Sequence, residues 1–307
     1  MLAEAGQQCG RVQATWPHRG CVRIGGVSLS LSAASPDDVQ LTRELEQFRA
    51  YDNNPDIEVS VHWARHLRAW PGETAFDSGA LWTLSHDGEE LVFDFSSPIL
   101  GSRPYKRLRV DPAFRSAQII LNRELLERYA PVYSLEYPAD ELLITNHLAF
   151  SGLGVEVHGC GLVDSEAGGQ LFVGHSGAGK STSTLLWKLL RDPKILSDDR
   201  LILRLHHGEL WMYGTPWHGE AAFAEQGAVK ISRIFVLQHG ERNKITPMSQ
   251  AQAAGELFAR CFPPFHSACA LERTVEFLDR ILNSVACYEF SFVPDASAVE
   301  AVLGFHE

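Results

Sequence analysis

Apolar and polar residues alternate along much of the first half of the chain, where β-branched residues are also frequent. A period of two residues is typical of half-buried strands, and turn-forming residues separate the alternating segments. One segment differs, because Ser35-Pro36-Asp37-Asp38 is typical of a helix start, so a helix is expected over Asp37–Tyr51. The alternation predicts strands at Cys21–Ser32, Ile57–Trp63, Glu90–Phe95 and Ala117–Leu121.

The second half of the chain combines helical periodicity with short apolar runs. Strands mixed with helices predict an α/β layer around a sheet. We therefore divide the chain into a β-rich α+β part at 1–140 and an α/β part at 141–307. Helices are expected near 140–151, 179–191, 249–261, 270–285 and 297–303. Strands are expected near 153–164, 170–174, 194–205, 209–213 and 229–238.

Composition narrows the classes of partner. The 307 residues carry 27 Lys and Arg against 38 Asp and Glu, a net charge of −11, which argues against nucleic-acid binding. No apolar run approaches the roughly 18–20 residues that cross a bilayer, and the N-terminal MLAEAGQQCGRVQ has no apolar signal region. We expect a cytoplasmic protein that does not bind membranes. Scattered thiols without zinc-site spacing agree with a reducing compartment: Cys9, Cys21, Cys160, Cys261, Cys269 and Cys287.

The strongest chemical signal is a glycine-rich loop between a short strand, Leu171–Val173, and a helix, Ser183–Leu190. Its spacing, Gly-x-x-x-x-Gly-Lys-Ser, fits a loop whose backbone N–H groups and following helix N-terminus bind nucleotide phosphates. Lys180 would reach the β- and γ-phosphates, and the Ser181 hydroxyl suits Mg²⁺. The predicted nucleotide-binding residues are Gly174, His175, Ser176, Gly177, Ala178, Gly179, Lys180, Ser181 and Thr182.

Two adjacent carboxylates, Asp198 and Asp199, follow the next apolar strand. Neighbouring residues on an extended strand point to opposite sides, so one can face Mg²⁺ while the other accepts the proton of an attacking hydroxyl. We predict both as catalytic residues, with Asp198 and Ser181 as metal ligands, and which one is the base stays open. The alternative is a solvated acidic turn.

Two further features could complete the site. His158, followed by Gly159, ends a strand that leads toward the glycine-rich loop, so we include it among the catalytic candidates, although a structural histidine is the alternative. Downstream, the turn from Tyr213 to Glu220 contains two glycines, a proline and an aromatic residue, as rigid loops do. A surface turn is equally compatible with that pattern. Its candidate substrate-loop residues are Trp217, His218 and Glu220.

The order of these motifs resembles the kinase domain of the HPr kinase/phosphorylase family, whose nucleotide-binding core is similar to that of ATP-dependent phosphoenolpyruvate carboxykinase. The resemblance covers about residues 140–303. It implies a P-loop core and phosphoryl transfer by His158 and the Asp pair. The family's Glu and Arg are missing around Trp211–Gly214, so HPr is not the expected substrate. The Gly-Thr-Pro-Trp form is more similar to kinases of bacterial peptide-modification clusters, some of which phosphorylate a precursor-peptide serine.

We therefore expect an ATP- and Mg²⁺-dependent kinase that phosphorylates a hydroxyl, such as a serine, of a peptide, protein or small metabolite. A nucleotide-binding regulatory protein with little turnover and a carboxykinase-like enzyme of small acids are the alternatives. A GTPase is disfavoured, because Asn243-Lys244-Ile245-Thr246 lacks the Asp that pairs with guanine. No second signature loop indicates an ABC-type ATPase. The sequence leaves a homo-oligomeric state open.

Overall fold

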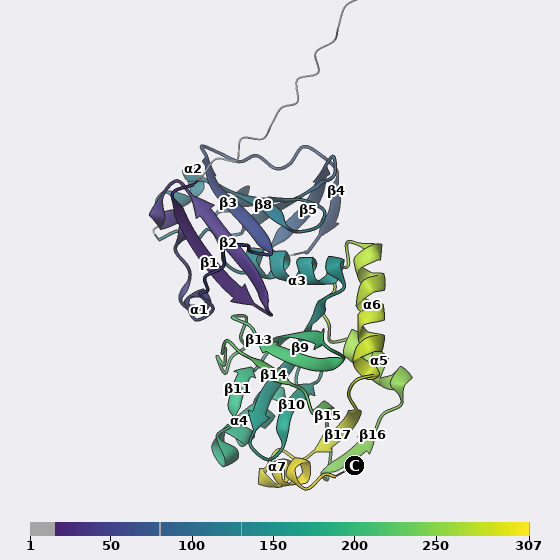
Figure 1. Cartoon of the computed structure of the whole chain (residues 1–307). Helices are drawn as coiled ribbons and strands as arrows, with labels where there is room; N and C mark the ends of the chain where they lie inside the picture. The colour runs from purple at the N-terminus through teal and green to yellow at the C-terminus, as the bar shows by residue number, and fades with distance from the viewer. Residues whose placement is uncertain (1–15, 80, 130, 307) are drawn as a thin grey trace, which may run out of the picture.

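The computed structural model describes residues 16–79, 81–129 and 131–306, and shows two mixed β-sheets with helix α3 (Ala139–Ser151) between them (Figure 1). The chain is thus of the α/β type. Cys9 and the N-terminal segment MLAEAGQQCGRVQ lie outside the described residues. Within the described ranges, no helix has both the length and the apolar character needed to span a membrane. The described cysteines are free thiols.

The first sheet has eight strands in the order β1-β2-β3-β8-β7-β6-β5-β4. The pairs β2–β3 and β3–β8 are parallel, and the other neighbours are antiparallel. Their bounds are β1 His18–Ile24, β2 Val27–Ala33, β3 Ile57–Ala64, β4 Thr74–Asp77, β5 Trp82–Asp87, β6 Glu90–Ser97, β7 Gly101–Val110 and β8 Ser116–Asn122. Short helices lie at η1 Pro36–Val39, α1 Arg43–Glu46 and α2 Arg123–Leu126.

Two predictions for the first half were wrong. The expected strand Cys21–Ser32 is a hairpin, because Gly25 and Gly26 have φ of +60° and +74° and reverse the chain. The expected helix Asp37–Tyr51 is only η1 and α1. Its second part instead pairs with β1, where Arg23 N donates to Phe48 O at 2.9 Å, so tertiary pairing overrides the helical tendency.

The second sheet has nine strands. Eight follow the order β14-β13-β12-β9-β10-β15-β17-β16, and β11 also pairs with β9. The strands β10, β15 and β17 are parallel, and the other pairs are antiparallel. The bounds are β9 Gly154–Asp164, β10 Gly168–Val173, β11 Lys194–Ser197, β12 Arg200–His206, β13 Glu209–Gly214, β14 Ala228–Lys230, β15 Arg233–His239, β16 Lys244–Pro247 and β17 Cys287–Phe292.

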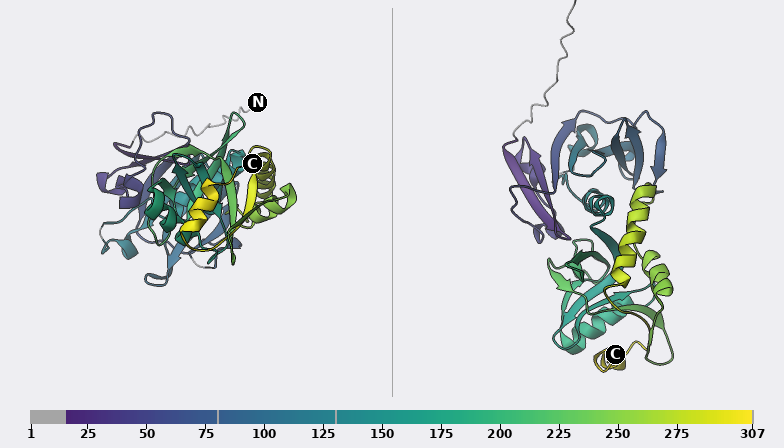
Figure 2. Two further views of the ribbon diagram at one scale, coloured as in Figure 1. Left: turned by 90° about the horizontal axis from the view of Figure 1, so that it is seen from below. Right: turned by 45° about the vertical axis from the view of Figure 1, so that its right-hand side comes forward.

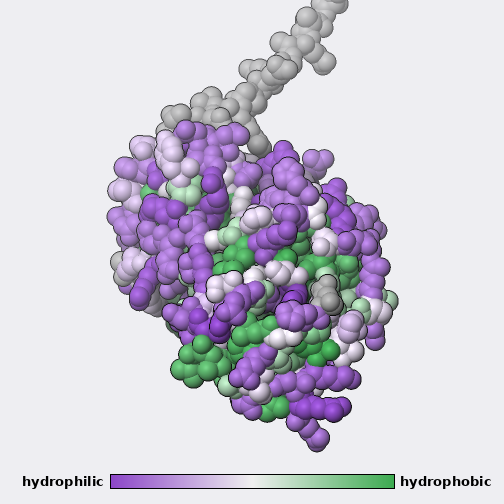
Figure 3. Space-filling model, turned by 60° about the horizontal axis from the view of Figure 1, so that its bottom comes forward, coloured by the Kyte–Doolittle hydropathy of each residue, from purple (hydrophilic) through white to green (hydrophobic). Residues whose placement is uncertain are grey.

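Helices cover both faces of the second sheet, so alternate residues of β10 enter different cores. Leu171 and Val173 pack with side chains of α5 and α6, whereas Phe172 packs with Trp187 of α4 and with α7. Figure 2 shows α6 running along the side of the molecule toward the first sheet. Figure 3 shows apolar patches on the lower surface, and α4 exposes Leu185 and Leu189. The helix bounds are α4 Lys180–Arg191, α5 Gln250–Phe258, α6 Ala268–Leu282 and α7 Ala296–Leu303.

Most predicted elements of the second half are present, with three differences. The expected strand 194–205 is interrupted at Asp198 and Asp199, which form a bend between β11 and β12. The expected strand 229–238 is likewise two strands, β14 and β15. The helix expected over 249–261 ends at Phe258. Strands β4, β5, β7, β16 and β17 were not predicted.

The two sheets share a hydrophobic core through α3. Its buried Leu143, Ile144 and Leu148 pack with the first sheet, and the same cluster includes Ile202 of β12 and Trp217. The turn between β1 and β2 also reaches the second sheet, because Arg204 Nη1 donates to Gly25 O at 3.1 Å. Segments from both halves are therefore held together beside β12.

Candidate functional site

The glycine loop, defined here as Gly174–Ser181, connects the end of β10 to the start of α4. Its glycines allow backbone conformations that other residues avoid: Gly177 and Gly179 have φ of +79° and +97°. A Cβ atom at Gly174 would lie 2.8 Å from the Ala178 Cβ, so only glycine fits where the loop leaves the strand. The loop also closes on itself, because Ala178 N donates to His175 O at 3.0 Å.

Lys180 begins α4 and points back into the loop. Its Nζ donates to Gly174 O at 2.9 Å and to His175 O at 3.2 Å, and the residue is only 7% exposed. Burial lowers the pKa of Lys180, and the negative charge of Asp199 partly opposes this. Asp199 is therefore within electrostatic reach of the lysine. Ser181 and the adjacent Thr182 are exposed on the first turn of α4.

A histidine that the sequence did not single out also contacts the loop. His239 ends β15, the parallel neighbour of β10, and its Nε2 lies 2.7 Å from Gly177 O. Its ring stacks on Phe292, with centroids 6.0 Å apart and an interplanar angle of 24°. The apex of the glycine loop is thus fixed to the neighbouring strand end.

Asp199 and His158 form a direct pair beside this loop. Asp199 Oδ1 lies 3.0 Å from His158 Nε2, and Gly159 N donates to the backbone oxygen of Asp199 at 2.8 Å. Strand β9 carries the histidine, and its Gly159 is opposite Val173, the last residue of β10. Both paired side chains are 28% exposed, which leaves them accessible to a small molecule.

Asp198 turns away from that pair and holds a loop. Its carboxylate is 3% exposed and accepts hydrogen bonds from the backbone N–H groups of Gly219, Ala221 and Phe223 at 3.2, 3.0 and 3.2 Å. The aspartates therefore point apart as expected, although they lie in a bend rather than in an extended strand. No hydrogen bond joins Ser181 to Asp198. In the described ranges, no cluster of three or more His, Cys, Asp or Glu side chains could hold a metal.

Arg200 lies at the centre of a carboxylate group. Its Nη1 contacts Glu141 and lies 3.4 Å from Glu156 Oε1, and its Nε lies 3.4 Å from Asp199 Oδ2. The guanidinium also lies 4.5 Å from the ring centroid of Phe262. Burial, followed by the charges of Asp199 and Asp140, raises the pKa of Glu156 well above its ordinary value. The Glu156 carboxyl therefore favours its protonated form.

The candidate substrate loop forms one wall of a cavity of about 390 Å³. Trp217 is buried and its Nε1 donates to Asp140 Oδ2 at 2.9 Å, whereas His218 and Glu220 are exposed. Glu220 does not line the cavity. The lining consists of Thr42, Glu44, Leu45, Glu136, Tyr137, Asp140, Asp199, Arg200, Pro216, Trp217 and His218. Both halves of the chain therefore contribute to this cavity, and Asp199 is part of its lining.

Arg260 is a second residue that sequence reasoning missed. Its backbone oxygen accepts from His158 N at 2.7 Å, and its charge helps to lower the pKa of Lys180, after the larger effect of burial. The guanidinium lies 2.5 Å from Glu256 Oε2, and its buried Nε has no hydrogen-bond partner. A cation with an unused donor thus lies near the glycine loop.

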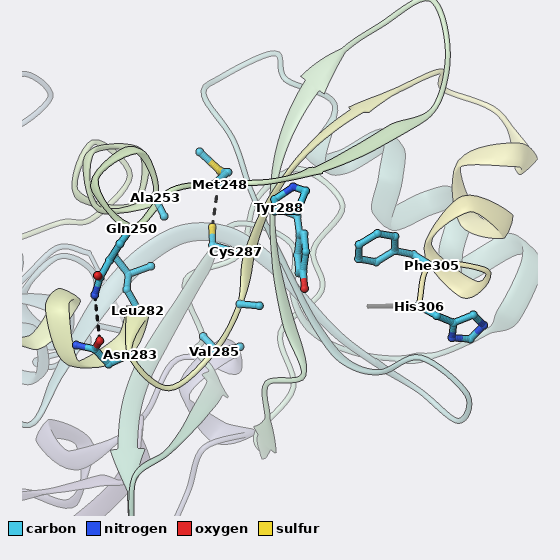
Figure 4. A pocket seen from close by; sticks show the side chains of 12 residues that line it. Met248, Gln250, Ala253, Leu282, Asn283, Val285, Cys287, Tyr288, Phe305 and His306 are labelled. Carbon is cyan, nitrogen blue, oxygen red and sulfur yellow. Dashed lines mark hydrogen bonds between the residues drawn. The ribbon is translucent and has the colours of Figure 1, made fainter.

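A larger cavity lies elsewhere, between β16, β17 and the ends of α5 and α6 (Figure 4). Its volume is about 670 Å³, and its described lining has no carboxylate, ammonium or guanidinium group. Figure 4 shows Met248 beside Cys287, with 3.9 Å between their sulfur atoms. None of the candidate residues faces it, so its size does not make it the site.

No protein-family model matches the sequence, and no curated protein matches it. Among solved structures, the HPr(Ser) kinase/phosphatase from Coxiella burnetii is similar over 48% of this chain and 91% of that chain, with 13% identity and a TM-score of 0.27. A TM-score this low does not establish a common fold. The function has to be inferred from the residues themselves.

Proposed function

We propose that this chain binds ATP and Mg²⁺ at the glycine loop and transfers the γ-phosphoryl group to a hydroxyl of an acceptor. One observation carries the proposal: the Asp199–His158 pair lies at the same end of the second sheet as Lys180. A phosphate-binding loop alone serves many reactions, but a loop beside an accessible carboxylate suits transfer to a hydroxyl.

The residues of the loop fit a polyphosphate. Lys180 Nζ donates hydrogen bonds to two carbonyl oxygens of its own loop. Phosphate oxygens can replace these two acceptors. Gly177 and Gly179 have no side chains to obstruct a ligand and adopt left-handed conformations, and the exposed first turn of α4 offers backbone N–H groups. The charge of Arg260 adds to that of Lys180. The loop therefore favours an anion.

Ser181 is our first choice of metal ligand, because its hydroxyl is exposed next to Lys180. Bound Mg²⁺ supplies charge neutralisation for the phosphates. Asp198 already accepts three backbone N–H groups, so we assign it first to holding the loop at 215–223. A ligand role for Asp198 requires that some of these hydrogen bonds be given up.

We assign the role of general base to Asp199. Its carboxylate accepts the proton of the acceptor hydroxyl while the acceptor oxygen forms a bond to the γ-phosphorus. The bond from that phosphorus to the β–γ bridging oxygen breaks, and ADP leaves with the bonding electrons. His158 holds Asp199 in position through its 3.0 Å contact. We further propose that residues 1–140 supply the acceptor side of the site, and that residues 141–307 bind the nucleotide.

The proposal is tested with purified protein, γ-labelled ATP, Mg²⁺ and a bacterial cell extract, followed by mass spectrometry of labelled products. We expect a labelled hydroxyl product that is lost in Lys180→Ala and in Asp199→Asn. The exposed Asp279→Asn on α6 is the matched control and should retain activity. Tight ATP binding without any phosphorylated product would instead identify a nucleotide-binding regulatory protein.

A further inference from the structure

The cavity that Asp199 lines has a size that restricts what it can bind. Its volume of about 390 Å³ is near the lower end of the roughly 300–1,000 Å³ typical of small-molecule sites. Its walls come from α1, from the start of α3 and from the turn Pro216–His218. A small compound fits such a space, whereas the surface of a folded protein does not.

The charge of the lining is predominantly negative. Four carboxyl groups and one guanidinium, that of Arg200, line the cavity, and the buried Lys106 pairs with one of these carboxyl groups, Glu136, at 2.8 Å. Arg200 is itself paired with Glu141, which does not line the cavity, so little of its positive charge is left for a ligand. An anionic compound would therefore be repelled. The four carboxyl groups belong to Glu44, Glu136, Asp140 and Asp199.

Asp140 supplies an independent sign of a missing partner. It is 2% exposed, its Oδ2 accepts from Trp217 Nε1, and its Oδ1 is buried without a hydrogen-bond partner. Buried carboxylate oxygens almost always have a donor, so an unpaired one in a cavity wall points to a donor brought by a ligand. An ammonium group provides three such donors. The Tyr137 ring in the same wall can also face a cation.

We propose that this cavity binds the phosphoryl acceptor, and that the acceptor is a small compound carrying both a hydroxyl and a protonated amine. The ammonium group binds at Asp140 and Glu44, and the hydroxyl lies at Asp199. There the hydroxyl proton passes to Asp199 as the oxygen bonds to the γ-phosphorus and ADP leaves. This inference rests on the proposed function, and it narrows the acceptor to cationic amino alcohols.

The test uses three matched compounds with the same three-carbon skeleton: 2-amino-1,3-propanediol, glycerol and glycerate. Their binding to the full chain at pH 7.5 is measured by ligand-observed NMR. We expect the cationic amine to bind at least about tenfold more tightly than glycerol, as charge-assisted hydrogen bonds predict, and glycerate not to bind. Asp140→Asn and Glu44→Gln should each weaken amine binding about tenfold.

The matched control is Glu46→Gln, which lies on the same helix α1 but does not line the cavity, and it should bind the amine normally. Circular dichroism confirms that each variant is folded. The inference is overturned if glycerol or glycerate binds as well as the amine, if no amine binding occurs at tens of millimolar, or if the Asp140 and Glu44 variants match the control.

A second readout separates this inference from the function on which it rests. Lys180→Ala should lose ATP binding but keep amine binding, because Lys180 does not line the cavity. Amine binding without phosphoryl transfer would refute the proposed kinase activity and leave the cationic site in place. Transfer to neutral or anionic acceptors alone would support the kinase and refute the cationic site.

Discussion

Asp140 is a buried carboxyl group whose ionisation opposes folding. Burial raises its pKa from the ordinary value of 3.8 to about 6, although the hydrogen bond from Trp217 and the charge of Lys106 act in the opposite direction. One pKa unit corresponds to about 1.4 kcal/mol, so ionised Asp140 costs the folded state about 3 kcal/mol. If the ammonium group of a ligand binds here, part of this cost is recovered on binding.

The sign of the pH dependence follows from the raised pKa. Below pH 3.8 the carboxyl group is protonated in both states and costs nothing. As the pH rises toward 6, the unfolded chain loses its proton first, so the folded state becomes progressively less stable. The Asp140→Asn substitution abolishes this titration, and the Asn oxygen can still accept the hydrogen bond from Trp217. The unpaired amide N–H groups of the Asn lower the free energy of unfolding by about 1–3 kcal/mol at every pH. The pH dependence is therefore the diagnostic quantity.

As the pH rises from below 3.8 to well above 6, the free energy of unfolding of Asp140→Asn should rise by about 3 kcal/mol relative to that of the wild-type chain. Roughly half of this rise should occur between pH 5 and pH 8. Urea unfolding at pH 5, 6.5 and 8, followed by tryptophan fluorescence, measures the gain. Asp164→Asn is the control, because the pKa of Asp164 is shifted in the opposite direction. Burial tends to raise the pKa of Asp164, but Arg191 and two backbone N–H groups hold it below its ordinary value. That variant should lose a similar amount of stability at pH 5, 6.5 and 8, because a pKa below the ordinary 3.8 places the titration of Asp164 below this range. If the difference in free energy of unfolding between Asp140→Asn and the wild-type chain stays constant with pH, the raised pKa of Asp140 is refuted.

Three further predictions follow from single contacts. Gly25→Ala should lower the free energy of unfolding by about 1–2 kcal/mol or more, because Gly25 has φ of +60° and an added Cβ would overlap Ile202; an unchanged Tm would contradict this packing. Arg260→Ala should weaken ATP binding about fivefold, because the charge of Arg260 adds to that of Lys180 near the glycine loop; an unchanged ATP affinity would show that this charge does not act on the nucleotide. Asp198→Asn should raise the acceptor KM more than it lowers kcat, because Asp198 holds the loop at 215–223, and steady-state kinetics separates the two effects.

Local sequence patterns predicted the elements that depend on their own residues. The helix expected near 140–151 is Ala139–Ser151, and the strand, glycine loop and helix around Lys180 occur in the expected order. These segments have strong periodicity and clear glycine signals, so their neighbours matter little. His158 and Asp199 were both candidates and lie 3.0 Å apart, while their chemical roles stay predictions.

The errors arose where distant residues decide the structure. Strand β7 was not predicted, because Lys106 and Arg107 interrupt its apolar positions. Both are buried since each finds a carboxylate far along the chain: Arg107 Nε lies 2.5 Å from Asp94, and Lys106 Nζ lies 2.8 Å from Glu136. No local sequence pattern indicates that these carboxylates will pair with Lys106 and Arg107. His239 and Arg260 were missed for the same reason, because only the fold brings them to the glycine loop.

The bend at Asp198 and Asp199 explains how two adjacent carboxylates come to serve different purposes. The Asp198 side chain is buried and fixes the backbone that follows Trp217, and the Asp199 side chain stays partly exposed beside His158. Trp217 Nε1 in turn donates to Asp140 in the first turn of α3, the helix that packs against the first sheet. The strand break therefore links the proposed base to the wall that would bind the acceptor. A continuous strand over 194–205 would have had no bend at Asp198 and Asp199, and so could not have joined the proposed base to the cavity wall in this way. The strand prediction therefore failed at the residues on which the proposed chemistry depends.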